Sequence, residues 1–265
     1  LQSGQSLVNA TWDDASEKIS SMNGEQGHLN ETVMEQILSS YSPHEREMRK
    51  NGRPSIGSGL IFPLSEEKIM IDPLYLEDHW PRIAAIDFGW DHPTAVVWCA
   101  MDTEEEMFYV YDCYRASKAS PAVHSEVIRG RPHFIPIVYP HDGNRRDSMG
   151  NPGLADQYRN LGCNFLLEHF TNPPALGNNK GSNSVEEGIM ALLQAMEKGK
   201  FKVFSTLGDW FEEFRMYHRK QNKVVPFRDD LMSATRYAFQ SQRHSVAGKD
   251  PTWTQDVEYR NYGII

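Results

Sequence analysis

The chain has 265 residues, 39% of them hydrophobic and 24% charged, which is enough for one sizeable core and typical of a globular protein. No apolar run reaches the ~18 residues of a membrane-spanning helix, which excludes that class. The three cysteines, Cys99, Cys113 and Cys163, lack CxxC spacing, so neither a disulfide framework nor a zinc knuckle is expected. Because the chain begins at Leu1 without a charged-then-apolar leader, we expect a piece of a longer protein that is not secreted.

Charge is distributed unevenly along the chain. The net charge is −9, and residues 1–80 contribute most of it, with 6 Lys and Arg against 13 Asp and Glu. Residues 198–228 are instead basic, with eight Lys and Arg against three Asp and Glu. That local excess of positive charge suits contact with phosphate groups, although a solvated helix face with lysine-rich flanks explains it equally well.

The first 80 residues differ in character from the rest. They predict a helical stretch near residues 30–50, followed by a Gly-, Pro- and Ser-rich segment at 51–59. We interpret residues 1–80 as a linker or the end of an upstream domain, residues 81–245 as the main domain and residues 246–265 as a C-terminal tail.

From residue 82 onward, apolar runs and turn residues predict an α/β domain. Three β-branched and aromatic runs predict an antiparallel meander at residues 83–87, 94–101 and 107–114. Ser120 and Pro121 start a helix that runs to about residue 129. The remaining predicted elements are a fourth strand at 134–139, a helix at 153–161, a fifth strand at 164–167, a helix that begins with a capping box at Ser184, and helices at 209–221 and 230–240.

Four aspartates lie where strands end or a helix begins. Asp87 ends the apolar strand 83–87, Asp142 follows the fourth strand, and Asp229 and Asp230 open the last helix. Each has an ordinary explanation, since Asp87 and Asp142 suit turns and Asp229 suits a helix N-cap. One N-cap does not explain two adjacent aspartates, however, and a charge at the end of a buried strand needs a partner.

If these carboxylates converge, they require cations. Two of them about 5 Å apart repel by roughly 3 kcal/mol at an effective dielectric near 20. Clustered carboxylate oxygens suit Mg²⁺ or Mn²⁺, and two such ions about 3.5–4 Å apart can clamp the attacking and leaving oxygens of a phosphodiester. We therefore expect Asp87, Asp142, Asp229 and Asp230 to bind two Mg²⁺ or Mn²⁺ ions, with Asp87 shared between them.

Three segments carry a resemblance to a known family: residues 85–94 (AIDFGWDHPT), 139–143 (YPHDG) and 228–238 (RDDLMSATRYA). In this order they resemble the nuclease domain of the large terminase subunit of tailed bacteriophages. The resemblance implies a ribonuclease H-like α/β fold, in which a mixed sheet of strand order 3-2-1-4-5 is flanked by helices and strands 1 and 4 are neighbours. It also implies the same four aspartates as metal ligands.

The resemblance implies a metal-dependent endonuclease domain that cuts concatemeric double-stranded DNA during viral DNA packaging, in the host bacterial cytoplasm. The implied partners are DNA, the small terminase subunit, the portal protein and an upstream ATPase domain of the same polypeptide. Residues 10–14 (ATWDD) and 42–62 resemble the junction that follows such an ATPase. No Gly-x-x-x-x-Gly-Lys-Ser/Thr phosphate loop occurs, so ATP-driven translocation is not expected of this chain.

Two other functions stay open on the sequence. Asp87-Phe-Gly89 fits the Asp-x-Gly turn of actin-like and sugar-kinase ATPases, but the bulky continuation at residues 90–93 hinders close approach of a phosphate. A catalytically idle DNA-grip or capsid-docking module needs only the basic helix at 209–223. Loss of activity on removing a single aspartate distinguishes a nuclease from that module.

Six basic residues are candidates for contact with the DNA backbone. Two follow Asp142 closely, one lies in the glycine-rich loop 171–183, and three lie in the basic segment. They are Arg145, Arg146, Lys180, Arg215, Arg219 and Lys220. Solvated loop and helix side chains remain the alternative for each of them. No base-reading motif is visible, so we expect cutting without sequence specificity.

Overall fold

The computed structural model describes residues 31–39, 59–145, 152–174, 181–221 and 223–248. Its centre is a six-stranded mixed sheet of order β1-β6-β4-β3-β2-β5. The strands span Met70–Ile71 (β1), Arg82–Asp87 (β2), Thr94–Asp102 (β3), Met107–Ala116 (β4), Ile137–Val138 (β5) and Phe201–Phe204 (β6). A separate two-stranded hairpin consists of Arg219–Lys220 (β7) and Lys223–Val224 (β8).

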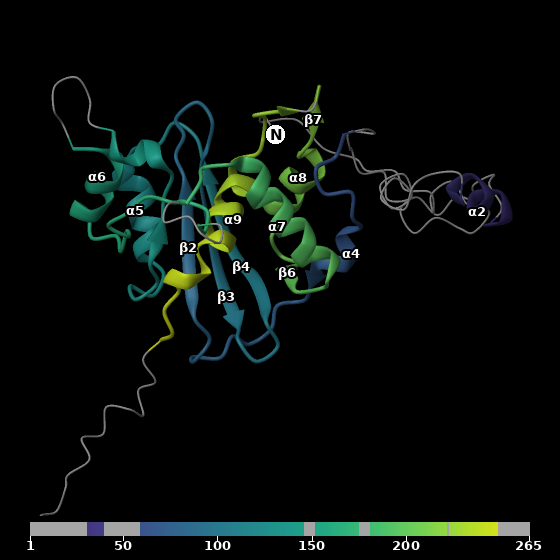
Figure 1. The fold of residues 1–265 in the computed structure, drawn as a ribbon, viewed down its shortest axis with the longest axis horizontal. Helices are drawn as coiled ribbons and strands as arrows, with labels where there is room; N and C mark the ends of the chain where they lie inside the picture. The colour runs from purple at the N-terminus through teal and green to yellow at the C-terminus, as the bar shows by residue number, and fades with distance from the viewer. Residues whose placement is uncertain (1–30, 40–58, 146–151, 175–180, 222, 249–265) are drawn as a thin grey trace, which may run out of the picture.

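Helices cover both faces of this sheet (Figure 1). The helices in the described ranges span Glu31–Ser39 (α2), Glu66–Ile69 (α4), Pro121–Arg129 (α5), Leu154–Asn160 (α6), Val185–Glu197 (α7), Gly208–Met216 (α8) and Asp230–Gln240 (α9), with short 3-10 turns at His141–Asn144 (η1) and Gln242–His244 (η2). In the described ranges, no helix is long and apolar enough to cross a membrane. All three cysteines are free.

Two hydrophobic clusters bury the sheet because successive side chains of a strand point to opposite faces. Ile83 and Ala85 of β2 belong to a cluster that includes residues of α7, α8 and α9. Ala84 and Ile86 belong to a second cluster with residues of α5 and α6. Helix α9 packs on β2 and β3, so the central strands lie between α9 and the α5–α6 layer.

The predicted meander is confirmed, because β2 pairs antiparallel with β3 and β3 pairs antiparallel with β4. The predicted strand order is confirmed as well, since β5 lies parallel to β2 on its other side. The fourth strand is shorter than predicted, at two residues, and the fifth is reduced to one parallel bridge between Phe165 and Ile137.

Two strands of the central sheet were not predicted from the sequence. β6 pairs parallel with β4 and β1 pairs parallel with β6, so together they extend the sheet beyond the meander. The predicted helix at 209–221 ends at Met216, because Tyr217 has extended backbone and the β7–β8 hairpin follows. Of the helix predicted at 30–50, residues 31–39 are helical, and residues 40–58 lie outside the described part.

Part of the predicted N-terminal segment packs into the same core. Ile61, Phe62 and Ile69 are buried in the cluster formed with α7, α8 and α9, and β1 belongs to the central sheet. Residues 59–71 are therefore integrated with the α/β fold, although they precede residue 81. The division of the chain at residues 80 and 245 stays a prediction.

Candidate functional site

Asp87 and Asp142 follow neighbouring parallel strands. Asp87 is the last residue of β2 and is partly buried, and Asp142 lies in η1, shortly after β5. The parallel register sets Ala85 opposite Val138. Because parallel strands end at the same edge of a sheet, the structure delivers both aspartates to one sheet edge.

Gly143 allows η1 to pack against the end of β2. A Cβ at this position would lie 2.7 Å from Cε2 of Phe88 and 2.7 Å from Cδ2 of Tyr139, which is too close for packed carbon atoms. Phe88 directly follows Asp87 in the chain. The absence of a side chain at Gly143 therefore keeps its neighbour Asp142 near the end of β2.

Asp229 and Asp230 reach the site from the start of α9. Asp229 is the N-cap residue of this helix, but its side chain makes no capping hydrogen bond, so a capping role does not account for its carboxylate. Asp230 is only 7% exposed, and its Oδ2 has no hydrogen-bond partner among the described residues. A buried carboxylate oxygen without a partner is costly, and a bound cation would remove that cost.

Asp142, Asp229 and Asp230 lie close enough to Asp87 to affect its ionisation. The pKa of Asp87 is raised to about 8, first by burial and then by the charges of Asp230, Asp142 and Asp229. Burial and the charge of Asp230 raise the pKa of Asp229 to about 6, and burial raises that of Asp230. Asp87 is therefore the carboxylate whose ionised form is disfavoured by the charges of three acids from two other segments.

Two basic residues that the sequence analysis missed lie beside these acids. The charge of Arg236 lowers the pKa of Asp87, and the charges of His92 and Arg236 lower that of Asp229. The buried guanidinium of Arg236 lies over the ring of Tyr237, 4.6 Å from its centre. The sequence places both residues near the acids, because Arg236 follows Asp229 by two helical turns and His92 lies in the segment 85–94 that contains Asp87.

The donor atoms of this site fit a divalent metal ion. The site offers the carboxylate oxygens that Mg²⁺ and Mn²⁺ prefer, including the unpartnered Oδ2 of Asp230. In the part of the chain that the structure describes, no three His, Cys, Asp or Glu side chains are already arranged so that they could hold an ion.

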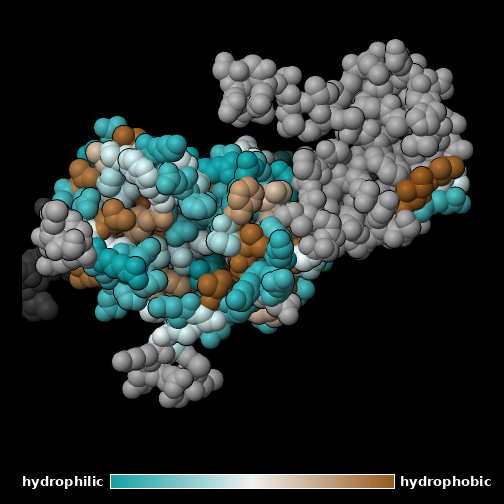
Figure 2. Space-filling view, turned by 90° about the horizontal axis from the view of Figure 1, so that it is seen from above, coloured by the Kyte–Doolittle hydropathy of each residue, from teal (hydrophilic) through white to brown (hydrophobic). Residues whose placement is uncertain are grey.

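Two of the predicted DNA-contact residues are free to meet solvent. Arg145, three residues after Asp142, and Lys220 of β7 are exposed. Arg146 and Lys180 lie outside the described residues. On the face drawn in Figure 2, hydrophilic side chains are interspersed with small hydrophobic patches.

Two other predicted DNA-contact residues are engaged with acids. Arg215 donates to Glu66 at 2.8 Å, and Arg219 donates two hydrogen bonds, of 2.5 and 2.7 Å, to Glu186. Contact of either guanidinium with a phosphate would have to replace an existing ion pair. The net positive charge of residues 198–228 therefore overstates the charge that is available to DNA.

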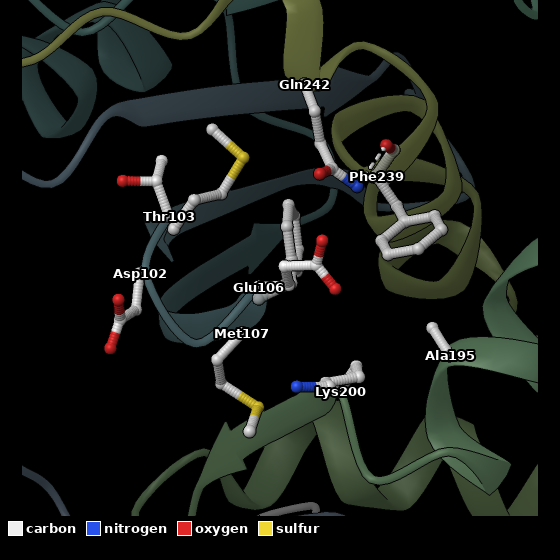
Figure 3. A pocket seen from close by; sticks show the side chains of 10 residues that line it. Asp102, Thr103, Glu106, Met107, Ala195, Lys200, Phe239 and Gln242 are labelled. Atoms are coloured by element: carbon white, nitrogen blue, oxygen red, sulfur yellow. Dashed lines mark hydrogen bonds between the residues drawn. The ribbon is translucent and has the colours of Figure 1, made fainter.

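A cavity of about 380 Å³ lies at the other end of the sheet (Figure 3). Asp102, Lys200 and Phe239 are among the residues that line it. Asp102 ends β3, whereas Asp87 pairs with the start of that strand, so the length of β3 separates the cavity from the acidic site. Lys200 in this cavity donates to the carbonyl oxygen of Glu105 at 2.6 Å. The cavity thus lies away from the clustered carboxylates.

Comparison with known proteins gives relatives for most of the chain. The sequence matches the family described as Terminase RNaseH-like domain over residues 84–242. The terminase large subunit of Salmonella phage P22 is 38% identical over 224 residues, which are 84% of this chain and 44% of that protein. That of Enterobacteria phage LP7 is 39% identical over 213 residues, 80% of this chain and 44% of the relative. The chain thus spans less than half the length of these curated relatives.

Solved structures show the same fold. The nuclease domain of the P22 large terminase has a TM-score of 0.65 and 37% identity, covering 72% of this chain and 95% of that one. The large terminase of a thermophilic bacteriophage has a TM-score of 0.53 at 14% identity, covering 80% and 52% of the two chains, a likeness of fold alone. The family match includes Asp87, Asp142, Asp229 and Asp230. The chain therefore belongs to the terminase ribonuclease H-like domain family.

Proposed function

We propose that this chain is the endonuclease domain of a viral DNA-packaging terminase large subunit, which hydrolyses double-stranded DNA with two divalent metal ions. One observation carries the proposal: burial, and then the charges of Asp230, Asp142 and Asp229 from two other segments, raise the pKa of Asp87. Such a concentration of carboxylates is stabilised by protonation or by bound cations, and bound cations give it the means to hydrolyse a phosphodiester.

Asp87 is the shared ligand in this proposal, because the other three carboxylates all act on its ionisation. Asp142 supplies a ligand from the exposed side, and Asp229 and Asp230 supply ligands from the start of α9. When bound, two Mg²⁺ or Mn²⁺ ions stabilise the charge on the attacking and leaving oxygens. Water is the nucleophile, and no covalent enzyme intermediate is required.

The DNA backbone is proposed to contact basic residues identified in the sequence. Arg145 is the strongest candidate, since it lies three residues beyond Asp142 and is exposed. Lys220, Arg146 and Lys180 are assigned the same role. Arg215 and Arg219 contribute only if a phosphate displaces the carboxylate that each now binds. Contacts of this kind hold DNA without reading its sequence.

The wider context is also proposed from the relatives. They are large terminase subunits, of which this chain spans 44%. An upstream ATPase domain of the same polypeptide, the small terminase subunit and the portal protein are the proposed partners. Concatemeric DNA in the host bacterial cytoplasm is the proposed substrate, and the choice of cutting site is assigned to those partners.

Digestion of supercoiled plasmid tests the proposed activity. The unmodified chain should nick and linearise plasmid with Mn²⁺ or Mg²⁺ and leave it intact with chelator. Asp87→Asn, Asp142→Asn and Asp230→Asn should each lose most of this activity. Asp102→Asn is the matched control, because Asp102 also ends a strand but at the opposite edge of the sheet. Intact plasmid with the folded, unmodified protein under every condition would favour an idle DNA-grip module.

A further inference from the structure

The first turn of α9 is capped by a residue from another helix. Glu213 of α8 has 0% exposure, and its Oε2 accepts a hydrogen bond of 2.6 Å from the backbone N–H of Leu231. A helix leaves such N–H groups free in its first turn, and the N-cap side chain ordinarily binds one of them. Asp229 occupies the N-cap position and makes no such bond. Glu213 takes over the capping role, so the Asp229 carboxylate is not used as the cap of α9.

Arg115 of β4 holds Glu213 in this position. Its Nη1 donates to Oε1 of Glu213 at 3.0 Å, which leaves Oε2 for Leu231. Its Nη2 donates to Asp209 at 2.9 Å and also to Glu212. Three acids of one helix thus bind a single guanidinium from the sheet. Because a buried carboxylate is tolerated only when it is paired and hydrogen-bonded, these partners fix the orientation of Glu213.

The residue before the acidic pair is tethered to the same helix. Arg228 donates through Nη1 to Glu212. Its backbone φ is +52°, a left-handed conformation that is uncommon for residues other than glycine. The bond from Arg228 to Glu212 and the bond from Leu231 to Glu213 lie on either side of Asp229 and Asp230 in the chain. Both aspartates are therefore held between two anchors on α8.

We use the term α8 clamp for four of these side chains: Arg115, Glu212, Glu213 and Arg228. We propose that the α8 clamp consists of positioning residues, which keep the carboxylates of Asp229 and Asp230 directed at the acidic site. This inference rests on the proposed function and deepens it, because the clamp acts through the backbone of α9 and not by contact with DNA. Without Glu213, Asp229 becomes an ordinary N-cap and turns its carboxylate toward its own helix.

Glu213→Ala tests the clamp, with Asp112→Asn as the matched control. Asp112 is an acid of β4 that also binds an arginine, Arg131, at 2.8 Å, and this ion pair involves neither α8 nor α9. In the metal-free protein, amide hydrogen exchange at Leu231 should be faster in Glu213→Ala and unchanged in Asp112→Asn. This readout requires neither metal nor DNA.

Metal binding and catalysis provide two further readouts. The Mn²⁺ affinity of Glu213→Ala, measured by calorimetry, should fall roughly 10- to 100-fold, the usual effect of losing a group that orients a metal ligand. The kcat for plasmid cleavage should fall, while the KM for DNA stays close to that of the unmodified protein. Asp112→Asn should match the unmodified protein in both measurements.

Coupling to Asp229 distinguishes positioning from a general loss of stability. Since the cap acts through Asp229, adding Glu213→Ala to Asp229→Asn should lower Mn²⁺ affinity little further. Adding Glu213→Ala to Asp142→Asn should instead lower Mn²⁺ affinity by as much as Glu213→Ala does in the unmodified protein. Glu213→Gln keeps the side-chain volume but has only one oxygen to accept from Arg115 and Leu231. The Mn²⁺ affinity of this variant should therefore lie between those of the unmodified protein and Glu213→Ala. Glu213→Gln replaces Glu213→Ala in every measurement if the alanine variant does not fold.

The outcomes separate the two proposals. Unchanged Mn²⁺ affinity in a folded Glu213 variant, or unchanged exchange at Leu231, would overturn the clamp and leave the proposed nuclease intact. Full additivity with Asp229→Asn would overturn it as well. If the unmodified protein neither binds Mn²⁺ nor cuts plasmid, the proposed function fails first, and the role of the clamp in a metal site fails with it.

Discussion

Replacement of Asp87 by a neutral residue should stabilise the metal-free protein. Asp87→Asn removes the charge and keeps the shape of the side chain. Burial and three neighbouring acids raise the pKa of Asp87 from 3.8 to about 8 in the folded protein. Between these two values the folded state binds more protons than the unfolded state, so the free energy of unfolding falls as pH rises. The asparagine variant lacks this cost.

The size of the effect follows from the pKa difference. Because one pKa unit corresponds to about 1.4 kcal/mol, the largest possible gain from Asp87→Asn is roughly 2 kcal/mol at pH 5, about 4 at pH 7 and about 6 at pH 9. The other carboxylates gain charge when Asp87 is neutral, so the measured gain should be a fraction of these limits. Its increase with pH is the diagnostic feature.

Urea denaturation with chelator at pH 5, 7 and 9 measures this gain, with Asp102→Asn as the control. Asp87→Asn should be more stable than the unmodified protein, and by a larger margin at pH 9 than at pH 5. A variant that is less stable at pH 9, or a margin that does not change with pH, would refute the reasoning. Mn²⁺ at 100 times its Kd should add about 2.7 kcal/mol to the unmodified protein and much less to the variant.

Three further predictions concern ion binding, packing and DNA. Apparent Mn²⁺ affinity should weaken as pH falls from about 8 toward 6, because protons on Asp87 compete with the ion; calorimetry across this range should not give a flat profile. Gly143→Ala should cost roughly 1–3 kcal/mol of stability and lower cleavage, whereas Gly208→Ala, whose Cβ meets no neighbour, should do neither. Lys220→Ala should lower the slope of log DNA affinity against log salt concentration by about one. Arg219→Ala removes a guanidinium that is already paired with an acid, so it should lower this slope by less, and equal effects of the two changes would contradict the assignment.

The central part of the fold could be predicted from the sequence because its strands are long and apolar. The runs at 83–87, 94–101 and 107–114 match β2, β3 and β4 within one or two residues. β6 was missed because it has four residues and one of them, Lys202, is charged. β1 has two residues, too few for any periodic pattern. β6 depends on pairing with β4, and β1 depends on pairing with β6, which local sequence does not encode.

The acidic site was predictable to the extent that it follows from strand and helix ends. Asp87 and Asp142 are at strand ends, and the pair at 229–230 begins a helix, so topology alone brings them to one region. Glu213 had a weaker signal, since its spacing from Trp210 puts it on the buried face of α8. Its bond to Leu231, 18 residues away, depends on how α8 packs against α9. That packing is a tertiary property, which periodicity does not reveal.

Anomalous diffraction from crystals soaked in Mn²⁺ locates the bound ions directly. We expect two Mn²⁺ peaks about 3.5–4 Å apart, with carboxylate oxygens of Asp87 bound to both. Asp142 and at least one of Asp229 and Asp230 should complete the ligand set. Peaks elsewhere on the molecule, with the Asp87 and Asp142 carboxylates in contact with no ion, would contradict it.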